Sequence, residues 1–309
     1  MSKSRDQPRV QQLIPGLVGP ADVDWTRVLR SRYLIDQTFR YRYPTPIARL
    51  RQRLVIEPPH RHGGQWGRRS RFRTSAPGAV VSRRLDDFGN TVIEVQAEEA
   101  GPNLEFEARI EVERDHEPGS VQEDPCWLRD PRLRCCQGLT AAGVRVHAAA
   151  TAIARERLSG LQLAERVNGW THESLRYQSG ITSVGTSAED ALRLGCGVCQ
   201  DYTHVMVAVC RTLGLAARYV SGHLLGEGGT HAWVEVLLPA ADGLTTDGPA
   251  AAEVHAFDPT HGRPAGTRYV TVAVGADYSD VAPTSGTYLG EPGELSTRKR
   301  VDIVELVYG

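Results

Sequence analysis

Three short segments carry side chains of the kinds used in acyl transfer, and the first is centred on Cys199. The segment 195–201 (GCGVCQD) comes directly before an apolar stripe at helical spacing, which places Cys199 in the first turn of a buried helix. A thiol there lies near unpaired backbone N–H groups and the positive end of the helix dipole, and both favour the reactive thiolate. Taken alone, a cysteine at a helix start is more often an inert small residue.

A histidine and an aspartate follow on two segments of strand character. His231 and Trp233 share one face of the segment 230–236 (THAWVEV), because residues two apart in a strand point the same way. An imidazole held beside an aromatic ring suits a general base. Asp258 lies before Pro259, where a strand must end, and its carboxylate can bind the far nitrogen of an imidazole. Taken separately, His231 could be no more than an exposed histidine on a strand, and Asp258 no more than an aspartate that caps a turn.

Together the segments give a nucleophile at a helix start, a base on one strand and an orienting carboxylate on the next. The stretches GVCQDYTHVMVAVCRTLGLAARYVSG, THAWVEV and AFDPTHG resemble the three catalytic blocks of the transglutaminase-like superfamily. YRYPTPIARLRQRLVIEP and DDFGNTVIEV resemble the β-rich N-terminal region of its bacterial, cysteine-protease-type members, and VAVGADYSDVAPTSGTYLG resembles their C-terminal tail. The resemblance covers nearly all of residues 31–309.

The resemblance implies papain-like chemistry. Cys199 would attack a carbonyl to give a thioester acyl-enzyme, His231 would take the thiol proton and later activate water or an amine, and Asp258 would orient His231. Backbone N–H groups near Cys199 would hold the oxyanion. We expect hydrolysis of peptide or protein amide bonds ahead of transamidation, because no motif identifies an amine site. An inactive protein-binding module and a zinc-binding regulatory protein are the alternatives.

Cys196 departs from the family pattern and creates the spacing Cys196-x-x-Cys199. A redox pair would need a thioredoxin-like βαβ setting, which the surrounding pattern lacks. A zinc site would need further ligands, for which His204, His223 or His231 are available. We favour an accidental neighbour, which could still form a disulfide with Cys199 under oxidation and silence the enzyme.

Three further residues are accessory candidates. Asp201, in the first turn of the helix, is placed to accept backbone N–H groups, and Trp233 lies beside the predicted base. His223 shares a strand face with Tyr219 and Ser221 and is placed to line the cleft. No acidic loop of EF-hand type is present, and we expect neither a metal nor another cofactor.

The periodicity along the chain predicts an α+β protein. We expect a tail over residues 1–30, an antiparallel β-domain over 31–115, a linker over 116–139 and a transglutaminase- or papain-like core over 140–309, with helices packed on an antiparallel sheet. The helices are predicted over 140–158 and 161–177, from 187 and after 195. The later strands are predicted over 218–224, 230–238, 253–258, 269–274 and 301–307.

Charge and composition exclude some partners and leave others open. The net charge of -1 over 309 residues gives no basis for binding nucleic acid, and no apolar run is long enough to span a membrane. The N-terminal residues lack a signal-peptide pattern, so we expect a cytoplasmic protein whose six cysteines are thiols. Residues 1–84 are rich in arginine and residues 85–125 in acids, which we interpret as strands that pair across one sheet.

Overall fold

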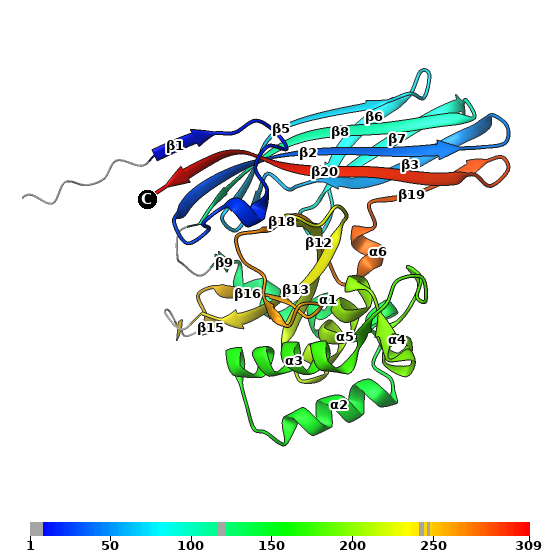
Figure 1. Cartoon of the computed structure of the whole chain (residues 1–309). Coiled ribbons are helices and arrows are strands. Elements are labelled where there is room, and N and C mark those ends of the chain that lie inside the picture. The colour runs from blue at the N-terminus through cyan, green and yellow to red at the C-terminus, as the bar shows by residue number, and fades with distance from the viewer. Residues whose placement is uncertain (1–8, 117–120, 241–243, 246–247) are drawn as a thin grey trace, which may run out of the picture.

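The chain folds into a two-sheet sandwich that lies beside a third sheet and its helices (Figure 1). A computed structural model describes residues 9–116, 121–240, 244–245 and 248–309. The predicted α+β class is confirmed, with an N-terminal region of antiparallel strands and helices packed on an antiparallel sheet. None of the described helices is long and apolar enough to cross a membrane.

The sandwich follows from strands that alternate buried and exposed residues. In the second strand, Tyr33, Ile35 and Phe39 face a core shared by both sheets. The larger sheet has the order β1 (Arg9–Gln12), β20 (Glu294–Tyr308), β2 (Val28–Arg42), β8 (Asn103–Asp115), β5 (Gln65–Thr74) and β4 (Arg61–His62). The smaller sheet has the order β19 (Thr284–Leu289), β3 (Ile47–Glu57), β7 (Thr91–Ala100) and β6 (Val80–Leu85).

The third sheet, here called the catalytic sheet, carries two of the three predicted catalytic residues. Its order is β17 (Arg263–Pro264), β16 (Ala252–Asp258), β13 (His231–Pro239), β12 (Ala216–Leu224) and β18 (Tyr269–Gly275), and β9 (Val121–Glu123) also pairs with β16. The helices are α1 (Pro131–Arg134), α2 (Val144–Ala154), α3 (Gly160–Ser174), α4 (Ala188–Leu194), α5 (Cys199–Thr212) and α6 (Tyr278–Val281). Short 3-10 turns are η1 (Pro20–Asp22), η2 (Pro125–Arg129) and η3 (Gly138–Thr140). Two small strand pairs remain, β10 (Arg176–Tyr177) with β11 (Cys196–Gly197) and β14 (Leu244–Thr245) with β15 (Gly248–Pro249).

Helix α5 is the central helix of this half of the molecule. Every residue from Asp201 to Arg211 is buried, because α2, α3 and α4 surround the helix on one side and the catalytic sheet covers the other. Val205, Met206 and Val209 belong to the stripe predicted from the sequence and lie fully in the core. A helix held on all sides keeps its first residue, Cys199, in a fixed position.

The arginine-rich and acid-rich blocks pair within the sandwich, which confirms the interpretation made from the sequence. Arg40 on β2 forms an ion pair of 2.6 Å with Glu105 on the neighbouring β8, and Arg68 on β5 forms one of 2.7 Å with Glu113 on β8. The charges therefore serve cross-strand pairing in the first place.

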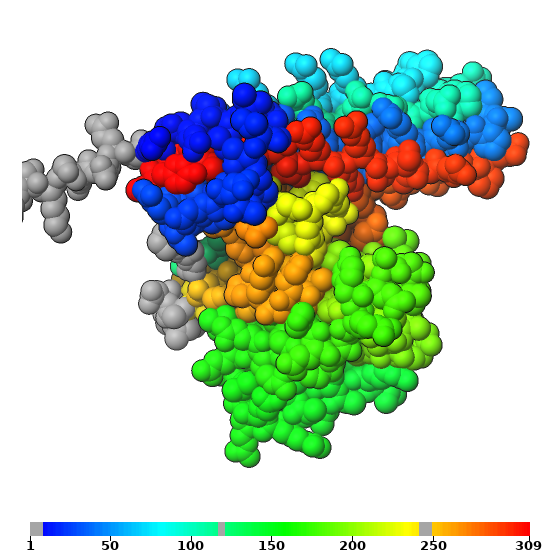
Figure 2. All heavy atoms as spheres, in the orientation of Figure 1, coloured from blue at the N-terminus to red at the C-terminus, as the bar shows by residue number. Residues whose placement is uncertain are grey.

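The end of the chain lies in the N-terminal sheets, which differs from the predicted catalytic core over 140–309. β20 pairs along its whole length with β2, and β19 pairs with β3. Figure 2 shows the chain's end in red beside its beginning in blue. Residues 121–123 of the predicted linker, in turn, join the catalytic sheet through β9. A strand's own alternation does not reveal which sheet it joins, because partners far apart in sequence decide it.

Two amide side chains of the sandwich cover the edge of the catalytic sheet. Gln65 bonds both backbone groups of Thr271 on the edge strand β18, at 2.7 and 2.9 Å. Asn90 does the same for Val274, at 2.7 and 2.8 Å. These four buried bonds satisfy backbone groups that an uncovered edge would leave without partners, so the sandwich and the catalytic sheet form one packed unit there.

Candidate active site

Cys199 is the first residue of α5, as the sequence predicted. The backbone N–H of Val198, just before the helix, donates to Asp201 Oδ2 at 2.7 Å, and the hydroxyl of Thr182 donates to the same oxygen at 2.7 Å. Asp201 is completely buried, and this burial raises its pKa. The predicted capping role of Asp201 is therefore present, and it anchors the loop that presents Cys199. The Cys199 side chain itself is partly exposed.

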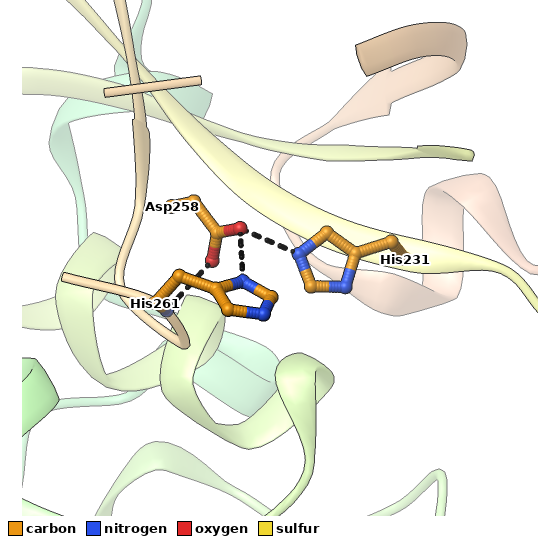
Figure 3. A group of neighbouring side chains, drawn as sticks. All are labelled: His231, Asp258 and His261. Carbon is orange, nitrogen blue, oxygen red and sulfur yellow. Dashed lines mark hydrogen bonds and ion pairs between the residues drawn. The ribbon is translucent and has the colours of Figure 1, made fainter. Parts of the chain in front are cut away.

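His231 and Asp258 meet in the interior at the end of the catalytic sheet (Figure 3). His231 begins β13 and Asp258 ends the neighbouring β16, so the antiparallel pairing brings both to the same end of the sheet. His231 Nε2 lies 2.8 Å from Asp258 Oδ2, and both side chains are buried. His231 also hydrogen-bonds Cys199, and because Asp258 engages Nε2, the nitrogen available for this bond is Nδ1.

The electrostatics of this group favour a protonated imidazole. Burial alone would lower the pKa of His231, but hydrogen bonds to Asp258 and Cys199 raise it to about 10. Burial alone would raise the pKa of Asp258, yet its bonds to His231, Tyr269 and His261 hold it well below the usual range. An imidazolium beside a sulfur stabilises the thiolate, which is the nucleophilic form.

Two residues that the sequence analysis did not select also bind Asp258. His261 Nδ1 lies 2.7 Å from Asp258 Oδ2, and the hydroxyl of Tyr269 donates to the same oxygen at 2.7 Å. The backbone N–H groups of Thr260 and His261 donate to Oδ1 at 2.9 and 3.2 Å. Asp258 is thus oriented by five donors rather than by His231 alone.

Trp233 packs behind the imidazole of His231. Its ring stacks near His231 with centroids 6.4 Å apart and meets the Tyr269 ring edge-on at 5.4 Å. Gly222 on β12 leaves the space that Trp233 fills, because a Cβ at this position would overlap the indole and the carbonyl oxygen of Val270. The indole therefore limits the movement of His231 within its pocket.

Glu227 lies near the ring nitrogens of His231 and His261 that do not bond Asp258. It belongs to the β12–β13 turn and is 46% exposed. Its carboxylate is 3.2 Å from His261 Nε2 and 3.6 Å from His231 Nδ1. Both histidines thus lie between two carboxylates, one buried and one at the surface.

Neither Cys196 nor His223 belongs to the group that His231, Asp258 and His261 form. Cys196 is a buried free thiol on β11, and the one group of three or more candidate metal ligands among the described residues contains no cysteine. His223 is 1% exposed, with Nδ1 3.4 Å from the carbonyl oxygen of Gly229. It is buried rather than on the surface of an open cleft, because the sandwich covers that end of β12.

His223 and His204 should make the fold sensitive to acid. Burial lowers the pKa of both to about 4, below the ordinary value of 6.5, so between these values the unfolded chain binds protons that the folded chain does not. Stability is therefore lost as the pH falls through this window. We expect each histidine to cost about 1–2 kcal/mol between pH 7 and pH 5 in urea unfolding. His204→Gln and His223→Gln should each flatten this pH dependence, whereas the exposed control His147→Gln should not; parallel curves for all four proteins would contradict the prediction.

Comparisons with known proteins agree with this architecture. Residues 147–245 match the transglutaminase-like superfamily, and residues 33–113 match the bacterial transglutaminase-like N-terminal region. An uncharacterised protein of Mycobacterium leprae is 37% identical over 131 residues, which are 39% of this chain and 42% of that protein. One of Mycobacterium tuberculosis is 35% identical over 135 residues, 40% of each chain. The match thus spans about two fifths of the length of these mycobacterial relatives.

A solved structure shares the fold. A crystal structure of a candidate cysteine protease from Cytophaga hutchinsonii superposes with a TM-score of 0.68 at 18% identity, covering 90% of this chain and 97% of that one. The chain belongs to the transglutaminase-like superfamily and carries the bacterial N-terminal region of that family. Cys199 and His231 lie inside the matched core, and Asp258 lies beyond its end. Together the family and the fold support a cysteine-based enzyme.

Proposed function

We propose that this chain hydrolyses amide bonds of peptides or proteins through a thioester on Cys199. The observation that carries the proposal is the chain of contacts from Cys199 to His231 and on to the buried Asp258. His231 holds the thiol proton while the sulfur attacks the carbonyl carbon, and then delivers it to the leaving amine. In the second step His231 takes a proton from water, which attacks the thioester and releases the acid.

The start of α5 supplies a place for the oxyanion of each tetrahedral intermediate. The backbone N–H of Cys199 is in the first turn of the helix, where N–H groups have no partner within the helix. A donor aimed at developing negative charge lowers the barrier to acyl transfer. Asp201 keeps this turn in place from the inside through its bond to the Val198 N–H.

The reactivity of Cys199 can be tested before any substrate is known. Cys126 and Cys135 are exposed, whereas Cys199 is only partly exposed, so accessibility alone predicts faster alkylation of the first two. We expect the opposite order with limiting iodoacetamide at pH 6–7, read by mass spectrometry of peptides, because the thiolate is the reacting form. Preferential labelling of Cys126 and Cys135 would contradict an activated Cys199 and favour a binding module on the same fold.

Hydrolysis and transamidation are separated by the fate of the acyl group. Peptide mixtures and unfolded proteins should give new carboxyl termini with the unaltered enzyme and none with Cys199→Ala, as measured by mass spectrometry in heavy-oxygen water. A fluorescent primary amine in the same reaction tests the alternative. Incorporation of the amine in place of cleavage would show that the reaction is acyl transfer to amines.

A further inference from the structure

His231, Asp258 and His261 form a group whose chemistry goes beyond orientation of a base. One possible ligand atom from each lies within 4.8 Å of the other two (Figure 3). Two imidazoles and a carboxylate are the ligands that zinc binds in sites with an open fourth position. We propose that this group is a zinc site whose occupation silences Cys199; the silencing rests on the proposed function, whereas the binding does not.

The three ligand atoms need little movement to hold the ion. Asp258 Oδ2 lies 2.8 Å from His231 Nε2 and 2.7 Å from His261 Nδ1. Ligands at about 2.0–2.1 Å from a tetrahedral zinc ion are roughly 3.3 Å apart, so each hydrogen-bonded pair must open by about half an ångström. The ion would replace the two imidazole protons now shared with Oδ2, and those protons would pass to solvent. The Tyr269 hydroxyl also donates to Oδ2 and can keep that bond.

Glu227 provides a second and independent indication of a metal site. Histidines that bind metals usually donate their other ring N–H to a carboxylate, which fixes the tautomer and the ring orientation. Here a single carboxylate stands 3.2 Å from His261 Nε2 and 3.6 Å from His231 Nδ1, the two nitrogens that would not bind the ion. Orientation of a catalytic base does not require this partner for His261.

The remaining partners of Asp258 leave the site both supported and accessible. Its second oxygen, Oδ1, accepts the backbone N–H groups of Thr260 and His261, so the carboxylate stays oriented when Oδ2 turns to the metal. The His261 side chain is 34% exposed, which gives the ion a path from solvent to the buried His231 and Asp258. The fourth position would be open to water.

Occupation of the site would remove the general base. With Nε2 bound to zinc, His231 keeps its remaining proton on Nδ1, the nitrogen that faces Cys199 and Glu227. In the metal-free site the neutral ring has its proton on Nε2, toward Asp258, and Nδ1 can accept a proton from the thiol or from water; zinc on Nε2 fixes the other tautomer, in which Nδ1 already carries the only ring proton. Loss of the base leaves Cys199 as an ordinary thiol, so the same residues would bind the metal and regulate the reaction.

Zinc binding is tested in a Cys199→Ala background, where neither the reaction nor the thiol contributes. Titration of Zn²⁺ against a chromophoric chelator should show one site per chain that Glu227→Gln weakens about 10- to 100-fold and that His261→Asn weakens at least as much. Glu227 is exposed, so its change carries little risk to folding. The control His255→Asn alters a histidine of β16, the strand that ends with Asp258; His255 pairs with Glu253 and not with the proposed ligands. Equal zinc affinity in all four proteins overturns the site.

A second measurement separates the metal site from the proposed function. In the unaltered enzyme, Zn²⁺ should slow alkylation of Cys199 by iodoacetamide, and a chelator should restore it; in His261→Asn the same Zn²⁺ concentration should have little effect. Binding in the Cys199→Ala background together with an unreactive Cys199 would retain the zinc site and reject the enzyme. Mg²⁺ and Ca²⁺ should not compete, because these ions prefer oxygen ligands.

Discussion

Replacement of His231 by alanine should lower turnover by on the order of 10⁴- to 10⁶-fold, because nucleophile and base act as one unit in this chemistry. The change removes the imidazolium that contacts Cys199 and that donates a hydrogen bond to the buried carboxylate of Asp258. Alkylation of Cys199 by iodoacetamide should slow in parallel, since the thiolate loses its partner. Both rates are measured on the same protein, the second by site-resolved mass spectrometry.

Two other cysteines of the chain serve as internal references in the alkylation experiment. Cys126 and Cys135 lie outside the catalytic group, so their rates should be the same in His231→Ala and in the unaltered chain. His255→Ala, a change of another histidine on the catalytic sheet, should preserve both turnover and Cys199 reactivity. An unchanged Cys199 rate in His231→Ala, with native circular dichroism, would reject His231 as the base.

The sequence selected the three side chains that the structure brings together because each of their signals is local. A cysteine before a helical stripe, a histidine within an alternating strand and an aspartate before a proline are all visible in short windows. His261 was accessible in the same way, since it follows Asp258 by three residues and the turn at Pro259 brings it back onto the carboxylate. Its spacing from Asp258 is the signal that could have identified it.

Tyr269 and Glu227 could not be predicted in this way. Tyr269 lies on β18, and the sheet order places β12 and β13 between that strand and the one that carries Asp258. The edge-on contact between the Tyr269 and Trp233 rings places the Tyr269 hydroxyl beside the Asp258 carboxylate. Glu227 is one exposed acid in a glycine-rich turn, and nothing in its neighbourhood distinguishes it from a solvated charge.

The fold was predicted best where one period dominates a segment. The helices and the strands of the catalytic sheet lie close to the expected ranges, because the spacing of apolar residues in a short segment shows which face of a helix or strand is buried. The return of β20 to the N-terminal sheet was not predicted, since its partner β2 lies more than 250 residues away in the sequence. The expected cytoplasmic location stays a prediction.

Replacement of Arg218 by methionine should destabilise the chain by about 3–5 kcal/mol, because it leaves a buried carboxylate without its main partner. Arg218 on β12 is 2% exposed and donates to Glu235 on β13 at 2.7 Å and to Glu123 on β9 at 2.7 and 2.9 Å. Glu235 also contacts His62 of the sandwich at 2.8 Å. Burial alone would lower the pKa of Arg218, but the two carboxylates raise it above the ordinary value, so the pair stays ionised.

Urea unfolding at pH 7 measures this effect, and two further proteins decide its origin. Arg193→Met removes a half-exposed ion pair with Asp190 and should change stability by less than about 0.5 kcal/mol. Adding Glu235→Gln to Arg218→Met removes the unpaired charge, so the double change should be less destabilising than the sum of the single ones. Additive effects would mean that Arg218 acts through packing alone. Coupled effects would show that the buried charges of Arg218 and Glu235 hold β12 to β13 within the sheet that carries His231 and Asp258.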